Sequence, residues 1–171
     1  MSSARPARTE AADYYFTYID LVSGEDIHNV LEVQQKEILA LLKGISEVES
    51  LKRYAPEKWS IRQVISHIND TERAFAFRAL WFARGFDSPL PGFDQNIAIG
   101  GADADARPWV SHIEEFATIR DATLSLFRNL SPEALMRRGI ASGNPFTVRA
   151  VEFITAGHVA HHLRILKERY L

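Results

Sequence analysis

The chain of 171 residues contains no cysteine. This excludes disulfides, thiolate metal sites and cysteine nucleophiles, so any thiol chemistry would have to use a thiol supplied by a cosubstrate. The chain also has no excess of charge of either sign, because 20 Lys and Arg against 22 Asp and Glu give a net charge of −2. A nucleic-acid partner would require a basic surface, so none is expected.

Long apolar runs are missing as well. No stretch approaches the roughly 20 residues of a membrane span, and the N-terminal segment MSSARPARTEAAD has no apolar core of the signal-peptide kind. We therefore expect a cytoplasmic protein without a membrane partner, and a flexible tail over residues 1–12. A composition of 46% hydrophobic and 25% charged residues is typical of a globular domain. We expect one domain spanning residues 1–171.

Hydrophobic residues recur at helical spacing in four long stretches, and no alternating pattern indicates a strand. The expected helices cover roughly residues 26–43, 60–84, 109–130 and 147–169. Residues 86–108 are rich in Gly, Pro, Ala and Asp and have no lasting period. A connection of this length is typical of a crossover, which lets the third helix run parallel to the second. The aromatic-rich segment 14–22 is expected to pack across the resulting bundle.

The last predicted helix contains the sequence GHVAHHLRILKERYL, which begins at Gly157. Residues four apart share one face of a helix, so His158 and His162 project together into its apolar stripe, and His161 falls at the border. A shared metal would satisfy one nitrogen on each buried ring. With a third imidazole from a facing helix, the pair would give a three-nitrogen site with open positions. His67, on the edge of the buried face of the second helix, is the available third ring.

Other polar residues have weaker assignments. His67 taken alone is more typical of a hydrogen-bonded core residue, and His28 and His112 are expected at the surface. Asp70 and Glu72 could act as acid or base or orient a ligand. We favour a structural function for both acids, paired with arginines such as Arg78 or Arg149, because acids at a helix seam are normally paired.

Three stretches of the chain resemble the DinB-like superfamily, which includes bacillithiol- and mycothiol-dependent enzymes. They are YAPEKWSIRQVISHINDTERAFAFRALWFARG, PLPGFDQN and GHVAHHLRILKERYL. The resemblance implies an all-α four-helix bundle of up-down-down-up order with a long crossover between the second and third long helices. It also implies a metal triad on His67, His158 and His162, holding nickel, zinc or an iron-like divalent ion. Some members transfer a low-molecular-weight thiol or isomerise a thiol adduct.

Two functions follow. The first is a divalent-metal-dependent enzyme acting on a small molecule, with thiol (S-)transferase or related hydrolase chemistry, Asp70 or Glu72 as acid or base, and a thiol as possible cosubstrate. The alternative is a non-enzymatic bundle in which the metal holds two helices together, and which acts as a dimeric interaction module. A fourth protein ligand would favour the alternative, since structural metal sites are closed. In either case we expect a homodimer.

Overall fold

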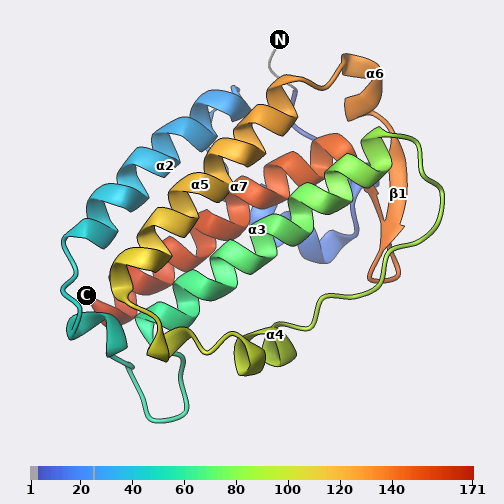
Figure 1. The fold of residues 1–171 in the computed structure, drawn as a ribbon. Helices are drawn as coiled ribbons and strands as arrows, with labels where there is room; N and C mark the ends of the chain where they lie inside the picture. The colour runs from blue at the N-terminus through green and yellow to red at the C-terminus, as the bar shows by residue number, and fades with distance from the viewer. Residues whose placement is uncertain (1–3, 25) are drawn as a thin grey trace.

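The computed structural model describes residues 4–24 and 26–171, and within them four long helices form a bundle (Figure 1). These helices are α2 (Ile27–Lys43), α3 (Ile61–Ala83), α5 (Trp109–Arg128) and α7 (Val148–Ile165), the last continued by a π-helical turn (Leu166–Tyr170). α3 packs against α5 and α7, and α2 packs against the same two helices. Among the described residues, no helix is both long and apolar enough to span a bilayer.

The bundle has the predicted up-down-down-up order. α2 and α7 run in one direction, and α3 and α5 run in the other (Figure 1). The neighbours α3 and α5 are therefore parallel, which a short loop cannot achieve, and the long crossover joins the start of α5 to the end of α3. Because α7 is antiparallel to α3, the C-terminal half of α7 faces the N-terminal half of α3.

Local sequence signals fix where the helices of the site begin. The Ser60 hydroxyl accepts from the backbone N–H of Gln63, and the Gln63 side chain returns to the Ser60 N–H, which is a capping box at the start of α3. Thr147 caps α7 by accepting from the N–H of Ala150. These caps set the helical phase, and with it the face on which each histidine lies.

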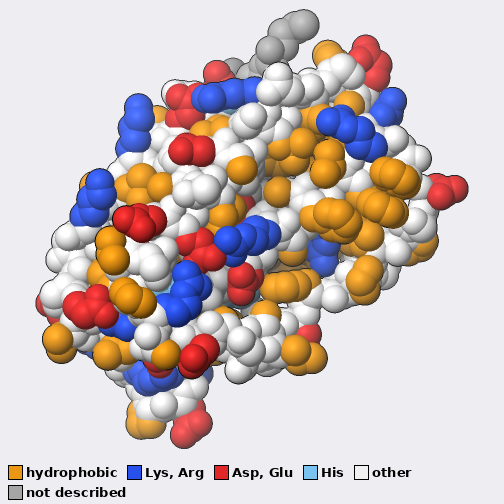
Figure 2. All heavy atoms as spheres, viewed as in Figure 1, with side chains coloured by type: hydrophobic (Ala, Val, Ile, Leu, Met, Phe, Trp, Pro, Cys, Tyr) orange, Lys and Arg blue, Asp and Glu red, His pale blue; other side chains and the backbone are white. Residues whose placement is uncertain are grey.

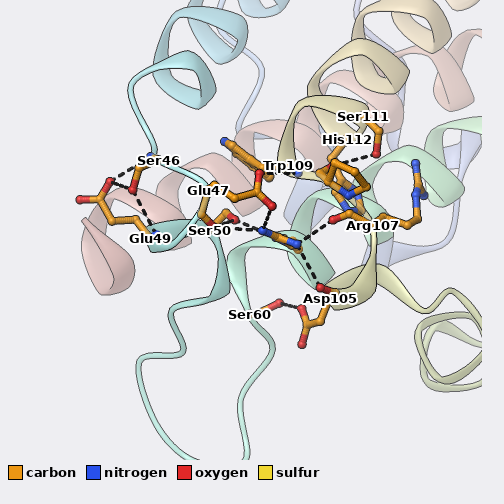
Figure 3. A network of polar contacts seen from close by, with 12 residues as sticks. Ser46, Glu47, Glu49, Ser50, Ser60, Asp105, Arg107, Trp109, Ser111 and His112 are labelled. Carbon is orange, nitrogen blue, oxygen red and sulfur yellow. Dashed lines mark hydrogen bonds and ion pairs between the residues drawn. The ribbon is translucent and has the colours of Figure 1, made fainter.

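The crossover is more ordered than its composition predicts. It contains a short helix, α4 (Gln95–Gly101), capped by Asp94, and a 3-10 turn (Ala104–Ala106). The buried Arg62 of α3 donates to the backbone carbonyls of Asp105 and Arg107, and it also contacts the carboxylate of Glu47. Figure 3 shows Glu47, Asp105 and Arg107 grouped around this contact. The guanidinium of Arg62 therefore fastens the end of the crossover to the bundle.

A small antiparallel hairpin precedes α7, although the sequence predicts no strand. Its strands are β1 (Arg138–Ala141) and β2 (Asn144–Thr147), preceded by the one-turn helix α6 (Pro132–Leu135). Ser142 and Gly143 join them with φ of 52° and 73°, the left-handed pair that a type I′ turn requires. Leu90 bridges the outer edge of β1 and Ala11 bridges that of β2, so both edges are covered. Strands of four residues containing Gly and Pro are too short for alternation to be visible.

The N-terminal segment packs across the bundle, as expected for the aromatic residues 14–22. It forms 3-10 turns (Arg8–Glu10 and Asp13–Tyr15) and the short helix α1 (Phe16–Ile19), which contacts α7. Residues 4–12 depart from the predicted flexible tail, because Glu10 is buried and accepts from Arg149 and Thr147. Residues 1–3 of that predicted tail lie outside the described residues.

Candidate metal centre

Three histidine rings meet between α3 and α7. The Nε2 atom of His158 lies 3.1 Å from the Nε2 atom of His67 and 3.1 Å from that of His162. His67 and His158 are buried, and His162 is partly buried. Among the residues that the structure describes, these three form the one group of three or more His, Asp or Glu side chains whose ligand atoms all lie within 4.8 Å. The structure therefore brings together the predicted triad.

The two helices supply these rings for simple geometric reasons. His158 and His162 are one turn apart on α7, so they stand on the same face. His67 lies in the second turn of the capped helix α3, which runs antiparallel to α7 and packs against it. Trp59 and Phe75 flank the rings, with centroids 5.1 Å from His67 and 5.8 Å from His158. Aromatic packing of this kind restricts how far the imidazoles can rotate.

The donor set fits a divalent metal. Two nitrogens bound at about 2.05 Å would be about 2.9 Å apart at a right angle and about 3.3 Å apart at a tetrahedral angle. The two 3.1 Å separations lie between these values. The other ring nitrogen of His67, Nδ1, lies 3.3 Å from the Thr71 hydroxyl. A partner on that nitrogen leaves Nε2 as the ligand atom, the arrangement usual in metal sites.

Burial keeps these rings neutral. Desolvation, helped by neighbouring histidines, lowers the pKa of His67 to about 4 and that of His162 to about 3. The same causes lower the pKa of His158 well below its ordinary value. Neutral imidazoles retain a lone pair on one nitrogen, so the triad is ready to ligate a cation at neutral pH without first losing protons.

The remaining histidines lie outside this group. His161 is half-buried beside the Tyr18 ring, consistent with its position at the border of the stripe. The expected surface location of His112 is wrong, because the crossover covers it and its Nε2 donates to the Ala104 carbonyl. His28 is also more enclosed than expected, since its Nε2 lies 2.8 Å from the buried carboxylate of Glu152.

The predicted acid and base candidates lie elsewhere. Both carboxylate oxygens of Glu72 accept from the buried guanidinium of Arg120, at 2.8 Å each. Asp70 is half-buried, and Arg73 lies 3.4 Å away. The favoured structural assignment thus agrees with the contacts, but the partners proposed for it, Arg78 and Arg149, do not. The sequence could not identify these partners, because Arg120 comes from a different helix, 48 positions away.

Two cavities flank the triad, and neither is lined by Asp70 or Glu72. One, of about 150 Å³, is lined by His67 and His158, and the other, of about 450 Å³, by His162 and His161. Residues from outside the four long helices line both cavities, and these are Tyr14, Tyr18 and Gln95. None of the three is among the site residues predicted from the sequence. The aromatic richness of segment 14–22 was the available signal, but it indicated packing only.

The chain is similar to known proteins in sequence and in fold. It matches the family model described as the DinB superfamily over residues 31–166, and no curated protein matches it. Among solved structures, YfiT from Bacillus subtilis is described as a probable metal-dependent hydrolase with an unusual four-helix bundle topology. It superposes with a TM-score of 0.72 at 18% identity, over 86% of this chain and 87% of that one.

A second solved structure, the mycothiol-dependent maleylpyruvate isomerase, gives a TM-score of 0.67 at 13% identity over 85% of this chain. The match covers 61% of the isomerase, so this chain spans less than two thirds of that protein's length. At such identities the two structures show a shared fold and nothing further. The family model, in contrast, matches most of the sequence, from within α2 to the end of α7, and we conclude that this protein is a member of the DinB superfamily.

Proposed function

We propose that the protein is a divalent-metal-dependent enzyme whose metal is held by His67, His158 and His162. The observation that carries the proposal is the convergence of three neutral Nε2 atoms beside two cavities, with that of His158 3.1 Å from each of the other two. Structural metal sites are closed by four protein ligands, whereas catalytic sites keep a position open. In the described part of the chain, no fourth His, Asp or Glu belongs to the cluster.

The reaction we propose is thiol transfer or a related hydrolysis. A divalent metal supplies such reactions with a lowered pKa of a bound water or thiol, and so with a nucleophile near neutral pH. The chain has no thiol of its own, so a transferase would take one from a low-molecular-weight cosubstrate. The descriptions of the two solved relatives, a probable metal-dependent hydrolase and a mycothiol-dependent isomerase, support this range of chemistry. Imidazole ligands suit zinc and nickel, which are the metals we propose.

The protein's own groups would enclose and orient the substrate. Tyr14 and Tyr18 line both cavities, and their hydroxyl oxygens lie 3.1 Å apart. Burial raises the pKa of Tyr18 above its ordinary value, so its phenol stays protonated and is available as a hydrogen-bond donor. Asp70 and Glu72 line neither cavity, so their geometry does not support the proton transfer proposed for them.

The test of this function combines metal analysis with a rate measurement. The purified protein, loaded with zinc or nickel, is incubated with several bacterial thiols and a chromogenic electrophile, and in parallel with ester substrates. We expect turnover that depends on the metal and is lost in His162→Ala. A rate equal to that of His162→Ala in every assay would remove the transferase and hydrolase versions.

One observation favours the alternative, a dimeric interaction module. Phe77, Trp81 and Phe86 form an aromatic cluster at the end of α3, with Trp81 and Phe86 stacked at 4.0 Å between ring centroids. Phe77 and Phe86 are each 51% exposed, and Figure 2 shows hydrophobic side chains gathered over this end of α3 and the adjoining β1. Exposed apolar patches of this kind mark contact surfaces, and a second copy of the chain is the partner we propose.

In the enzyme the metal takes part in the reaction. In the interaction module the metal only stabilises the bundle, and the aromatic cluster holds two copies of the chain together. Sedimentation equilibrium of the wild type and of Phe77→Asp measures the dimer. If the wild type is a dimer, loses its metal without changing oligomeric state and shows no turnover, the module is favoured over the enzyme. A small-molecule substrate, a cytoplasmic location and the absence of nucleic-acid and membrane partners remain part of the enzyme proposal.

A further inference from the structure

One buried arginine has no acidic partner among the described residues. Three arginines of the described chain are almost completely buried, and these are Arg62, Arg78 and Arg120. Arg62 is paired with Glu47 and Arg120 with Glu72. Among the described residues, no carboxylate lies within ion-pair distance of Arg78, although its side chain is only 6% exposed. A buried charge without a counter-ion is costly, so one that is retained calls for an explanation.

The groups around Arg78 orient its guanidinium without neutralising it. Its Nη2 donates to the hydroxyl of Ser142 at 2.9 Å, and the phenol of Tyr15, which lines the same cavity as Arg78, lies close enough to interact with its charge. Its Cζ lies 5.8 Å from the centre of the Phe75 ring. Burial raises the pKa of Tyr15, so the phenol is uncharged near neutral pH. An arginine stays protonated even when buried, so the positive charge of Arg78 remains unbalanced.

Arg78 faces the candidate metal centre through the smaller cavity. The 150 Å³ cavity is lined by Arg78 and Ser142 together with His67 and His158. On α3, His67, Thr71 and Arg78 are spaced by four and seven residues, so they follow one face of the helix. Eleven residues of helix rise correspond to about 16 Å between the Cα atoms of His67 and Arg78. The cavity therefore connects a fixed positive charge with two of the three candidate ligands, His67 and His158.

We propose that this cavity binds an organic acid, with its carboxylate on Arg78 and its reacting group beside His67 and His158 of the metal centre. The position of the reacting group rests on the proposed function, whereas the binding of the carboxylate to Arg78 does not. A carboxylate is the anion of choice because its single charge balances one guanidinium, and the planar fork matches its two oxygens. A phosphate carries more charge and is usually held by several donors. Arg78 would thus be a specificity-determining residue, with Ser142 and Tyr15 holding it in place.

Ligand-observed NMR tests the proposal with a defined probe. 4-Fluorobenzoate is titrated onto the full-length protein and followed by its ¹⁹F signal, with 4-fluorobenzamide as the uncharged analogue. The titration is repeated after chelation, because a carboxylate could otherwise bind to a metal. We expect the acid to bind in both states, the amide to bind at least about tenfold more weakly, and Arg78→Met to weaken binding of the acid by a similar factor.

Matched variants separate the site from general effects of charge. Arg78→Lys keeps the charge but loses the fork and should retain part of the affinity. Arg73→Met removes a charge from the same helix outside the cavity and should leave the affinity unchanged. If Arg78→Met does not fold, a shift of the Arg78 Nε–H signal on adding the acid to the wild type carries the comparison. An absent shift, equal binding of acid and amide, or undiminished binding by Arg78→Met would overturn the inference.

Metal analysis keeps this result apart from the proposed function. Elemental analysis of each sample reports metal content independently of the ¹⁹F titration. A protein that binds no metal but still selects the acid through Arg78 would retain the anion site and lose the metal-dependent enzyme. A protein that binds zinc but shows no preference for the acid would retain the metal site and lose the proposed anion site.

Discussion

The Nε2 atoms of His67 and His158 lie 3.1 Å apart, although 91 positions separate them in the chain. Two neutral imidazoles in this arrangement share at most one hydrogen bond, because one nitrogen must donate and the other accept. The Nε2 atom of His162 also lies 3.1 Å from that of His158, so the Nε2 atom of His158 has two other ring nitrogens as close neighbours. A cation bound by all three would satisfy them together, and for this reason the first prediction concerns metal.

We predict that His158→Ala loses the bound metal, whereas His161→Ala keeps it. His158 supplies the central nitrogen of the group, and His161 does not belong to it. Removing one of three ligands should lower the affinity by well over the 10–100-fold cost of losing an outer partner. Elemental analysis after dialysis gives the stoichiometry, and the rise in Tm on adding zinc gives an independent measure. Equal metal content in the two variants would refute the assigned ligand set.

The histidine pair and the bundle could be predicted because their signals are local. His158 and His162 are one turn apart, and Ser60 stands where a helix cap is required. Features that depend on distant packing could not be predicted. His112 is expected at the surface because it lies near a helix start, but it belongs to the buried face of α5, and its Nε2 donates to the Ala104 carbonyl of the crossover. The partner of Glu72 likewise depends on how α5 is placed against α3.

The second prediction concerns pH. Burial holds the pKa of His67 at about 4 in the folded protein, whereas an unfolded histidine titrates near 6.5. Between these values the unfolded chain binds more protons than the folded one, so the free energy of unfolding falls as the pH falls from about 6.5 to about 4. Above about pH 7 both states are neutral, and this group contributes no pH dependence. At pH 5, His67 alone should cost roughly 2 kcal/mol.

Urea unfolding of the chelated protein at pH 7.5 and pH 5.0 measures this effect. His67→Gln removes the titrating ring, so its midpoint should change less between the two pH values than that of the wild type. An identical pH dependence in both proteins would mean that His67 titrates normally in the fold, and it would weaken the case for a desolvated site.

The third prediction assigns Glu72 to stability. Arg120 donates to both oxygens of Glu72 and also to the side chain of Gln34, all within the core. Glu72→Ala should destabilise the protein by about 3–5 kcal/mol, because it leaves a buried guanidinium without a counter-ion. The double variant Glu72→Leu with Arg120→Met removes both charges and should recover most of this loss.

Denaturant unfolding compares the single and double variants, and elemental analysis follows the metal in both. Retained metal together with recovered stability would establish a purely structural pair. If the double variant were stable and held metal but had lost turnover that Glu72→Gln also lost, Glu72 would have a chemical function after all.

The last prediction concerns the close approach of α1 to α7. A Cβ atom built on Gly157 would lie 2.1 Å from the carbonyl oxygen of Tyr18, which is backbone and cannot rotate away. Gly157→Ala should therefore displace α1 and with it Tyr18, whose ring packs 5.5 Å from that of His158. We expect a loss of stability of about 1–3 kcal/mol, as for overpacking, and an opened cavity wall.

Gly100→Ala in α4 is the matched control, because nothing lies within 4 Å of its Cβ position. Helix propensity should make that change neutral or stabilising by up to about 1 kcal/mol. Thermal unfolding distinguishes the two, and if both substitutions raised the Tm, α1 would not be held against the histidine helix as described.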